Sequence, residues 1–209
     1  MNATEKIWMN GELVDWGEAK VHVGAHSLHH GSGVFEGIRC YETPGGPVIF
    51  RLRDHLQRLH DSARILHMEI PYAVDELAQA TRDLVRRNGL SSCYIRPLAF
   101  HGYGGLGVAP TGTQVDTAIL SFPWGAYLGE SQENGITAAI SSLRRVGASV
   151  VPHAAKATGV YLNSMLATME ARRAGYEEAI LLTEAGASAG CPGENVFVVK
   201  DGVVLCRPS

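Results

Sequence analysis

The 209-residue sequence predicts an α+β protein with two domains. Three observations predict this class: hairpin signals near both ends of the chain, helical repeats of apolar residues between strand-like runs, and a glycine- and aromatic-rich stretch between two apolar regions. With 45% hydrophobic residues, the chain can bury one sizeable core or two modest ones. We expect a small N-terminal α+β domain at 1–122, a linker at 123–130 and a second domain at 131–209.

Two β-hairpins are expected at the start of the first domain. Asn10-Gly11 separates two apolar runs, and this pair suits a type I′ turn because both central positions need positive φ. The β-prone runs 34–41 and 48–50 follow, separated by a turn-forming Thr-Pro-Gly-Gly cluster. We expect antiparallel pairing in each hairpin.

Two amphipathic helices follow these hairpins. Apolar residues recur every three or four positions from Leu52 to Leu66 and line one face of a helix, whereas Arg58 falls off that stripe. A second helix is expected at 74–87. The strands expected to complete the domain are 93–100 and 115–122.

The second domain mixes strands with one helix. The expected elements are a strand at 136–143, a helix at 161–175, a strand at 179–183 and a hairpin at 196–206 around Asp201-Gly202. Leu162, Leu166 and Met169 lie on one side of the helix, which predicts an amphipathic element. Because the chain stops directly after a strand, we expect this domain to be interrupted.

Composition and charge exclude several classes of function. With 18 basic and 21 acidic residues the formal net charge is -3, and no basic run is long enough to follow a phosphate backbone. Glu5 and Lys6 stand where a signal peptide needs an apolar core, and no stretch is apolar over about 20 residues. We expect a cytoplasmic protein that binds neither nucleic acid nor membranes.

Cysteine and histidine positions do not form a standard metal site. The four cysteines lie far apart without a C-x-x-C pair, which predicts buried thiols rather than disulfides or a zinc site: Cys40, Cys93, Cys191 and Cys206. A histidine cluster at 22–30 is interrupted by glycine and lacks a nearby cysteine or aspartate. We therefore expect no metal, and keep a histidine-cluster metal-binding protein as a weaker alternative.

The run 102–107 matches G-x-G-x-x-G, the dinucleotide-binding fingerprint, and follows a predicted strand. That fingerprint requires its last glycine to open a helix, whereas Pro110 and Gly112 interrupt any helix here. We expect a loop rather than a nucleotide site.

Arg96 lies in the middle of a predicted strand, where a cation must find an anion or remain poorly solvated. Tyr94 points to the same side of that strand, because side chains alternate between faces. A structural ion pair and a carboxylate-binding site both explain such an arginine.

Lys156 lies among small residues, where a strand-like run gives way to a helix. An ordinary surface lysine is one interpretation. The other is functional, because Ala155, Ala157 and Gly159 leave room for a flat ring to approach, and a desolvated lysine can attack a carbonyl.

Five motifs occur in a defined order and spacing: GSGVFEGIR at 31–39, QRLH at 57–60, YIRP at 94–97, AKATG at 155–159 and GENVF at 193–197. Together they resemble the bacterial branched-chain amino-acid aminotransferases of the class IV pyridoxal-phosphate-dependent family. The resemblance extends from Ile7 onward and implies that a small α+β domain and a larger pseudo-barrel domain hold pyridoxal 5'-phosphate between them, the second of them incomplete in this chain.

The resemblance implies how this cofactor is held. Lys156 would bond to it covalently and then shuttle a proton between substrate and cofactor. Arg58 would bind the phosphate, and Tyr161 the ring hydroxyl with support from Arg39.

The resemblance also assigns the substrate site, for amino acids and 2-oxo acids. Tyr94 and Arg96 would recognise carboxylates, including the distal carboxylate of glutamate. The apolar pocket for branched side chains would consist of Phe35, Trp124 and Tyr127. Leu106 and Val108 would complete the site of a neighbouring copy, so we expect a homodimer or a higher homo-oligomer.

Three features depart from the family pattern. Gly190 stands where relatives carry the glutamate that pairs with the ring nitrogen, so carbanion formation should slow. His30 replaces a tyrosine beside the substrate carboxylate. Relatives also continue for about another hundred residues, roughly one more domain.

The leading hypothesis is transamination between branched-chain L-amino acids and 2-oxoglutarate. The alternative, motivated by Gly190 and the interrupted domain, is a catalytically impaired or inactive remnant of the same fold.

Overall fold

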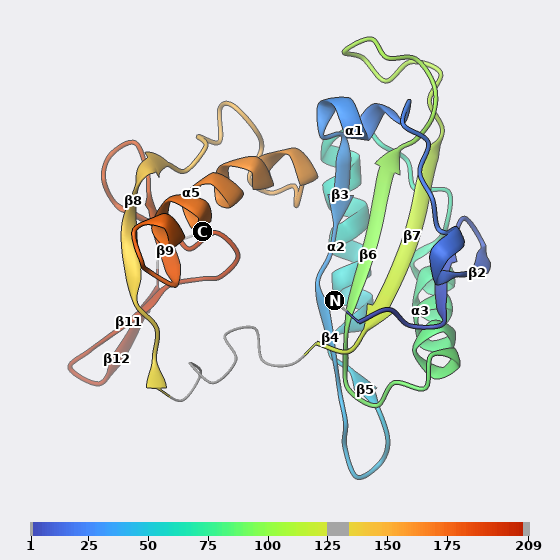
Figure 1. Cartoon of the computed structure of the whole chain (residues 1–209), viewed down its shortest axis with the longest axis horizontal. Helices are drawn as coiled ribbons and strands as arrows, with labels where there is room; N and C mark the ends of the chain where they lie inside the picture. The colour runs from blue at the N-terminus through green and yellow to red at the C-terminus, as the bar shows by residue number, and fades with distance from the viewer. Residues whose placement is uncertain (1, 125–133, 207–209) are drawn as a thin grey trace. The chain divides into compact units, whose positions relative to one another are not determined.

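The computed structural model describes residues 2–124 and 134–206 (Figure 1). Their contacts group the chain into two compact units. Unit 1 is Met1–Tyr127 with Ala154–Gly159, and unit 2 is Leu128–His153 with Val160–Ser209. The segment around Lys156 thus groups with unit 1, although we expected it within a domain at 131–209. The domain boundary at 123–130 stays a prediction, since it lies largely outside the described residues.

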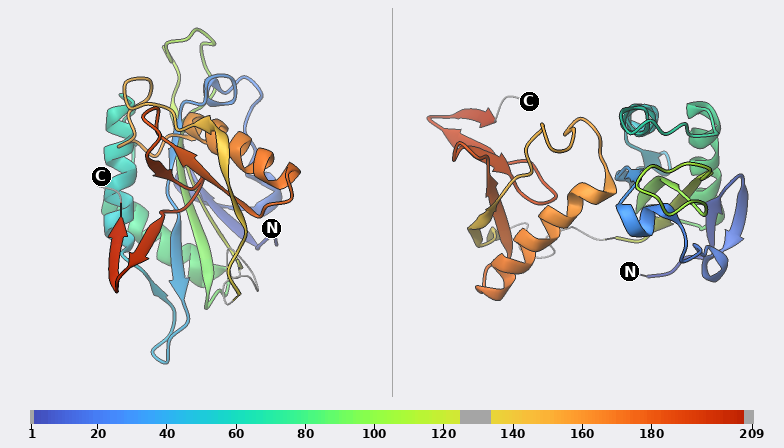
Figure 2. Two further views of the ribbon diagram at one scale, coloured as in Figure 1. Left: turned by 90° about the vertical axis from the view of Figure 1, so that its left-hand side faces the viewer. Right: turned by 90° about the horizontal axis from the view of Figure 1, so that it is seen from above.

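Unit 1 is built on a seven-stranded sheet with strand order β2-β1-β7-β6-β4-β5 and with β3 paired to β6. The strands are β1 Lys6–Met9, β2 Glu12–Asp15, β3 Gly33–Phe35, β4 Ile38–Tyr41, β5 Val48–Ile49, β6 Cys93–His101 and β7 Val115–Phe122. The helices are the 3-10 turn Trp16–Glu18, α1 His26–His30, α2 Leu52–Ile65 and α3 Val74–Arg87. In Figures 1 and 2, α2 and α3 lie on the same face of this sheet.

The core of unit 1 lies between this sheet and the two long helices. Leu56 and Leu59 on α2 and Leu77 and Leu84 on α3 are fully buried against sheet residues such as Ile95. The apolar spacing therefore predicted the helices and their inward faces correctly. The Asn-Gly turn is confirmed as well, since Asn10 has φ 50° and Gly11 has φ 98°.

The predicted strand 34–41 is divided into β3 and β4. Both strands continue one antiparallel register along β6, with Phe35 opposite Leu98 and Ile38 opposite Ile95. The break falls opposite Pro97, which has no N–H to donate across the ladder, although Glu36 N still donates to its carbonyl at 2.9 Å. The break leaves the Glu36 side chain at the centre of the site described below.

Unit 2 contains a β-α-β element. Parallel β8 Ala138–Arg144 and β9 Glu178–Leu182 are connected through α5 Tyr161–Arg173, and β10 Ser188–Gly190 pairs antiparallel with β9. A 3-10 turn at Thr158–Val160 precedes α5. The separate hairpin of β11 Phe197–Lys200 and β12 Val203–Cys206 turns at Asp201 and Gly202, as predicted.

The buried face of α5 differs from the expected one. Ser164, Ala167 and Ala171 are buried, whereas the larger residues that defined its apolar side are exposed: Leu162, Leu166 and Met169. Ala167 and Ala171 pack with Ala179 and Leu181 of β9, because small residues let the helix approach the strand closely. The helix is found where the sequence predicts it, but its predicted amphipathic character is wrong, because its apolar residues are spread around the helix.

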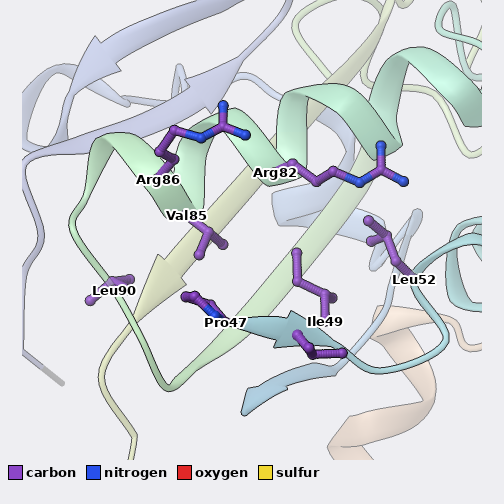
Figure 3. A pocket seen from close by; sticks show the side chains of 8 residues that line it. Pro47, Ile49, Leu52, Arg82, Val85, Arg86 and Leu90 are labelled. Carbon is purple, nitrogen blue, oxygen red and sulfur yellow. The ribbon is translucent and has the colours of Figure 1, made fainter. Parts of the chain in front are cut away.

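A surface cavity of about 420 Å³ lies in unit 1 between β5 and α3 (Figure 3). Its wall is mainly apolar, with Ile49, Leu52 and Val85, and Arg82 and Arg86 project from α3 at its rim. None of the predicted site residues that the structure describes lines it.

Among the described residues, no helix has the length and hydropathy needed to cross a bilayer.

Candidate active site

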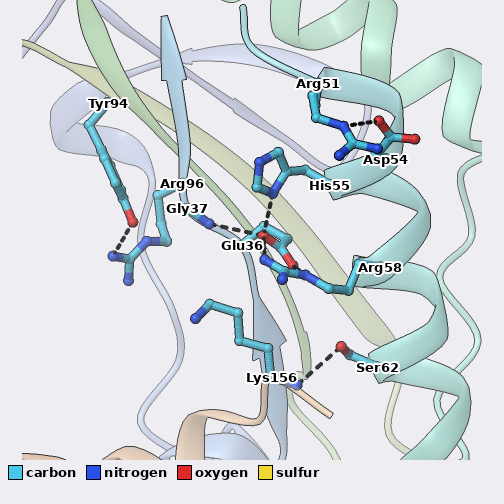
Figure 4. A network of polar contacts seen from close by, with 10 residues as sticks. All are labelled: Glu36, Gly37, Arg51, Asp54, His55, Arg58, Ser62, Tyr94, Arg96 and Lys156. Atoms are coloured by element: carbon cyan, nitrogen blue, oxygen red, sulfur yellow. Dashed lines mark hydrogen bonds and ion pairs between the residues drawn. The ribbon is translucent and has the colours of Figure 1, made fainter. Parts of the chain in front are cut away.

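The main chain of Lys156 is held on two sides. Phe35 N of β3 donates to Lys156 O at 3.1 Å, and Val34 and Ala157 form a β-bridge. Lys156 N donates to Ser62 Oγ of α2 at 3.1 Å (Figure 4). These bonds place a segment that is distant in sequence beside the sheet and α2.

The small residues around Lys156 allow this close approach. Ala155 and Ala157 are buried, and Gly159 N donates to Gly31 O at 3.2 Å. A Cβ on Gly31 would lie 2.8 Å from Gly159 Cα, so this backbone contact requires glycine. The small neighbours thus pack the main chain against β3, and the space for a flat ring that the sequence predicts beside Lys156 stays a prediction.

The Lys156 amine lies beside aromatic rings and a second cation. Lys156 Nζ is 5.0 Å from the centroid of the Phe35 ring, and Arg96 Cζ is 4.5 Å from the same centroid. Arg96 Nη2 donates to Tyr94 Oη at 2.9 Å, as Figure 4 shows. Four predicted site residues are thus brought together, with both cations attracted to one ring.

Arg96 retains an unsatisfied donor. Its Nε is buried without a hydrogen-bond partner, and in the part of the chain that the structure describes it makes no ion pair. The structural ion pair that the sequence left open is therefore not found there. A buried, unpaired guanidinium N–H is costly unless an acceptor arrives, and a carboxylate is the best-matched acceptor.

Arg58 lies in a network around a buried carboxylate. Glu36 is fully buried and accepts from Arg58 Nε at 2.5 Å and from Arg58 Nη2 at 2.7 Å. His55 Nδ1 lies 2.8 Å from Glu36 Oε2, and Gly37 N donates to the same oxygen at 3.3 Å. This two-point contact fixes the plane of the Arg58 guanidinium (Figure 4).

Burial by itself would raise the pKa of Glu36, but the hydrogen bonds from Arg58 and His55 outweigh it and hold the pKa below its ordinary value. Glu36 is thus an anion that orients the arginine. Sequence reasoning missed Glu36 and His55. The available signal was a glutamate inside the apolar run Val34 to Ile38, because a charge in a buried strand needs partners.

Other predicted residues extend the aromatic side of this group. The Trp124 ring lies 4.7 Å from the Tyr94 ring, and Arg39 Nη1 donates to Trp124 O at 3.1 Å. A Cβ on Gly37 would lie 2.1 Å from Tyr94 Oη, so the glycine makes space for the phenol. Tyr127 lies outside the described residues.

Two predicted residues belong to unit 2. Tyr161 is the first residue of α5, and Gly190 is the last residue of β10. Gly190 has φ +100° at a register irregularity between β10 and β9. An L-residue side chain at 190 is strained in this conformation, so the backbone itself disfavours glutamate there.

The remaining predicted residues lie near α1. His30 is exposed and its ring stacks on His26 at 4.2 Å. Leu106 and Val108, 53% and 86% exposed, lie on the loop between β6 and β7. This loop leads into a strand, as expected of a glycine run that is not a dinucleotide motif.

Metal binding by the histidine cluster is not supported. Both ring nitrogens of His26 are engaged, by Ser32 Oγ and Gly107 O. Within residues 2–124 and 134–206, no three histidine, cysteine or acidic side chains are grouped to hold a metal ion. Of the cysteines, Cys40 and Cys93 are buried as expected, while Cys191 is partly exposed and Cys206 is exposed.

Comparison with known proteins relates this arrangement to one family. Residues 33–209 match the family described as Amino-transferase class IV. The branched-chain-amino-acid aminotransferase of Escherichia coli strain K12 is 53% identical over 204 residues, which cover 97% of this chain and 66% of that relative. A putative branched-chain-amino-acid aminotransferase of Methanocaldococcus jannaschii is 40% identical over 97% of this chain and 68% of its own.

Solved structures give the same result. A crystal structure of the Escherichia coli branched-chain aminotransferase matches with a TM-score of 0.95 and 52% identity, over 97% of this chain and 67% of that one. The branched-chain aminotransferase of Thermobaculum terrenum, solved in its PLP form, matches with a TM-score of 0.88 and 35% identity, over 99% of this chain and 67% of that one. The chain thus spans about two thirds of the length of these relatives.

Proposed function

The chain belongs to the class IV aminotransferase family, and from this membership we propose that it transfers amino groups between branched-chain L-amino acids and 2-oxo acids, with 2-oxoglutarate as the co-substrate. The cofactor is pyridoxal 5'-phosphate, which the Thermobaculum terrenum relative carries. The observation that carries the proposal is the grouping of Lys156 Nζ with Arg96 over Phe35, since an amine and an unsatisfied guanidinium there fit a carbonyl and a carboxylate.

The described residues fit this cofactor in the chemistry of their donors. Lys156 would hold the cofactor through its amine, which condenses with the carbonyl group and releases water, and Arg58, oriented by Glu36, would offer guanidinium N–H groups to its phosphate. When bound, pyridoxal phosphate supplies an electron sink for the electrons left at the substrate Cα. We assign Tyr161, supported by Arg39, to its ring hydroxyl.

Lys156 then acts as the general base and acid. Its Nζ would take the proton from the substrate Cα, and in the second half of the exchange it would give a proton to the Cα of the new amino acid. The main chain of Lys156 is held by hydrogen bonds to Phe35 and Ser62, so only its side chain has to move. A fixed backbone with a flexible amine suits a group that must bind, release and carry a proton.

Arg96 binds the substrate carboxylate through the donors that lack a partner, and Tyr94 holds the guanidinium in place. The apolar side chain packs against Phe35, Trp124 and Tyr127, while His30 takes a position beside the carboxylate. We assign Leu106 and Val108 to the site of a neighbouring copy, so the active form is a homo-oligomer, and we place it in the cytoplasm.

Gly190 gives this chain a slower version of the reaction. Glycine has no carboxylate with which to stabilise a protonated ring nitrogen, and the φ of +100° favours glycine at this position. A turnover well below that of relatives is the expected consequence, and complete inactivity would support the alternative of a non-catalytic member of the family.

The deciding experiment is covalent trapping of the cofactor. The protein is incubated with pyridoxal phosphate, reduced with borohydride and mapped by peptide mass spectrometry. We expect the label on Lys156, and Lys6, Lys20 and Lys200 in the same chain serve as internal controls.

Lys156→Arg should remove both the label and the transfer of amino groups from leucine to 2-oxoglutarate. Arg96→Gln should retain the label but raise the KM for both substrates about tenfold or more, because a charged hydrogen bond to their carboxylates is lost. Equal labelling of all four lysines would refute the assignment of Lys156.

A further inference from the structure

The glycine-rich loop, residues 102–114 between β6 and β7, presents large apolar side chains to solvent. Tyr103, Leu106 and Val108 are 63%, 53% and 86% exposed. An exposed loop rich in glycine loses much conformational entropy when it is ordered, so specific contacts must hold it in one conformation. The structure contains such contacts, and they centre on one buried histidine.

His26 contacts this loop at two points. Its backbone N donates to Gly102 O at 2.9 Å, and its ring Nε2 lies 2.9 Å from Gly107 O. Gly107 is the residue between Leu106 and Val108. The ring is 1% exposed, so a buried side chain on α1 reaches the middle of an exposed loop.

The hydrogen-bond partners define which ring nitrogen carries the proton. Gly107 O can only accept, so Nε2 must be the donor. In the neutral ring Nδ1 is then an acceptor, and the Ser32 hydroxyl donates to it at 2.7 Å. Gly107 O therefore selects the tautomer, and the Ser32 hydroxyl supports the ring by donating to Nδ1.

Other contacts prevent the loop from taking a different path. His101 Nδ1 lies 3.0 Å from Thr113 Oγ1, which donates to Pro110 O at 2.8 Å. A Cβ on Gly104 would lie 2.8 Å from Thr113 Cα, so the two arms of the loop approach more closely than a larger residue allows. The arms are thus closed at the base, and the tip around Gly107 depends on His26.

We propose that His26 is a positioning residue that holds the tip of the glycine-rich loop through Gly107 O, so that Leu106 and Val108 are presented in a fixed orientation. The consequence for specificity rests on the proposed function, in which these two side chains complete the substrate pocket of a neighbouring copy. His26 does not touch the reacting atoms, and acts only through the loop.

The test compares His26→Asn with His26→Gln in the full chain. Asparagine can reproduce the Nδ1 contact with Ser32 but is too short for Gly107, whereas the glutamine amide can reach the position of Nε2. Limited proteolysis with chymotrypsin, mapped by mass spectrometry at Tyr103 and Leu106, measures how often the loop opens. We expect cleavage to be roughly fivefold faster in His26→Asn, because one hydrogen bond between the ring and the loop is lost. In His26→Gln we expect cleavage near the wild-type rate.

Two further variants complete the design. His29→Gln changes an exposed histidine of the same helix, which bonds to Val23 O, and should leave cleavage unchanged. Ser32→Ala keeps the imidazole and its contact with Gly107 O but removes the hydrogen bond that orients the ring at Nδ1, and should accelerate cleavage about twofold because the ring is less firmly held toward the loop. If His26→Asn fails to fold, as judged by its tryptophan fluorescence, Ser32→Ala decides the question.

Kinetics separate this inference from the proposed function. If both hold, His26→Asn raises the KM for leucine several-fold with little change in kcat, and His26→Gln restores it. Faster cleavage of His26→Asn in a protein without transaminase activity would uphold the positioning role and reject the proposed function. Equal cleavage of folded His26→Asn and wild type would overturn the positioning role.

Discussion

The helices of the two units differ in how their apolar residues are arranged: α2 and α3 of unit 1 are amphipathic, whereas α5 of unit 2 is not. In unit 1, α2 and α3 bury leucines between themselves and a broad sheet, together with Trp8, Ile38 and Ile95. In unit 2, the described core cluster consists of Ala167, Ala171, Ala179 and Leu181. Burial of apolar area is the main source of stability, so two regions with similar secondary structure should differ widely in stability.

The residues of the proposed site are divided between the same two units. Lys156, Arg58 and Arg96 are held by the larger core through Phe35, Glu36 and Tyr94. Gly190 and Tyr161 belong to the unit with the smaller described core. We infer that Lys156, Arg58 and Arg96 are held by the more stable unit, whereas Tyr161 and Gly190 belong to the less stable one.

Cysteine labelling should give the largest contrast between the units. Burial raises the pKa of Cys93 to about 12 and also raises that of Cys40, and both lie in unit 1. Cys206, in unit 2, is exposed. Iodoacetamide should therefore modify Cys206 at least about a thousandfold faster than Cys93, which reacts only after unit 1 opens. Mass spectrometry of timed samples measures both rates, and similar rates would show that unit 1 does not protect Cys93 from the reagent.

Removal of a core leucine should give the next largest difference between the units, this time in the free energy of unfolding. Leu56→Ala on α2 deletes a fully buried side chain and should lower the free energy of unfolding by about 3 kcal/mol. Leu166→Ala on α5, where the side chain is 44% exposed, should cost less than about 1 kcal/mol. Tryptophan fluorescence in urea reports on unit 1, because Trp8, Trp16 and Trp124 all lie there, and circular dichroism reports on both units. Equal losses of unfolding free energy in the two variants would contradict the conclusion that unit 1 has the larger buried core.

Neutralising Glu36 should have a smaller but pH-dependent effect. Its pKa is lowered in the folded state, so its contribution is present above the ordinary pKa of a glutamate and is lost as the pH falls through the folded pKa. Glu36→Gln should lower the free energy of unfolding by roughly 2 kcal/mol at neutral pH, because the charged hydrogen bonds to Arg58 and His55 are lost. The stability of unit 1 should then fall less steeply as the pH is lowered.

Asp54→Asn is the matched control for Glu36. Asp54, in the first turn of α2, forms an exposed ion pair with Arg51, the residue that precedes this helix, and should contribute little. Urea unfolding between about pH 3 and 7, the range over which carboxylates titrate, tests both variants by fluorescence. An acid profile of Glu36→Gln that matches wild type would exclude Glu36 as the source of the pH dependence.

The smallest effect is expected at Gly190. Gly190→Ala should lower the stability of unit 2 by about 1 kcal/mol, because alanine is strained at φ +100°. Gly147→Ala in the same unit is the control, since its nearest contact for a Cβ is Ser149 Oγ at 3.7 Å and its φ is not positive. Urea unfolding read by circular dichroism and by labelling of Cys191 measures the difference. If Gly190→Glu is as stable as wild type, the backbone does not oppose a carboxylate at this position.

The sequence predictions succeeded where an element depends only on residues that are neighbours in the sequence. The Asn10-Gly11 turn and the helices α2 and α3 follow from neighbouring residues, and they were found where expected. The short helix α1 and the strand β10 were not predicted, because a few residues carry too weak a periodicity. Glu36 was missed because its partners Arg58 and His55 lie on another element.

By itself, the sequence determined the α+β class and the family, because these depend on residue types at short spacings, while the roles of Lys156 and Arg96 stay predictions. Only the tertiary structure decided that Glu36 orients Arg58, that α5 turns its alanines inward, and that His26 holds Gly107. The physical reason is the same in each case. Burial, ion pairing and close packing depend on which distant segments meet, and a sequence pattern specifies a face without specifying its partner.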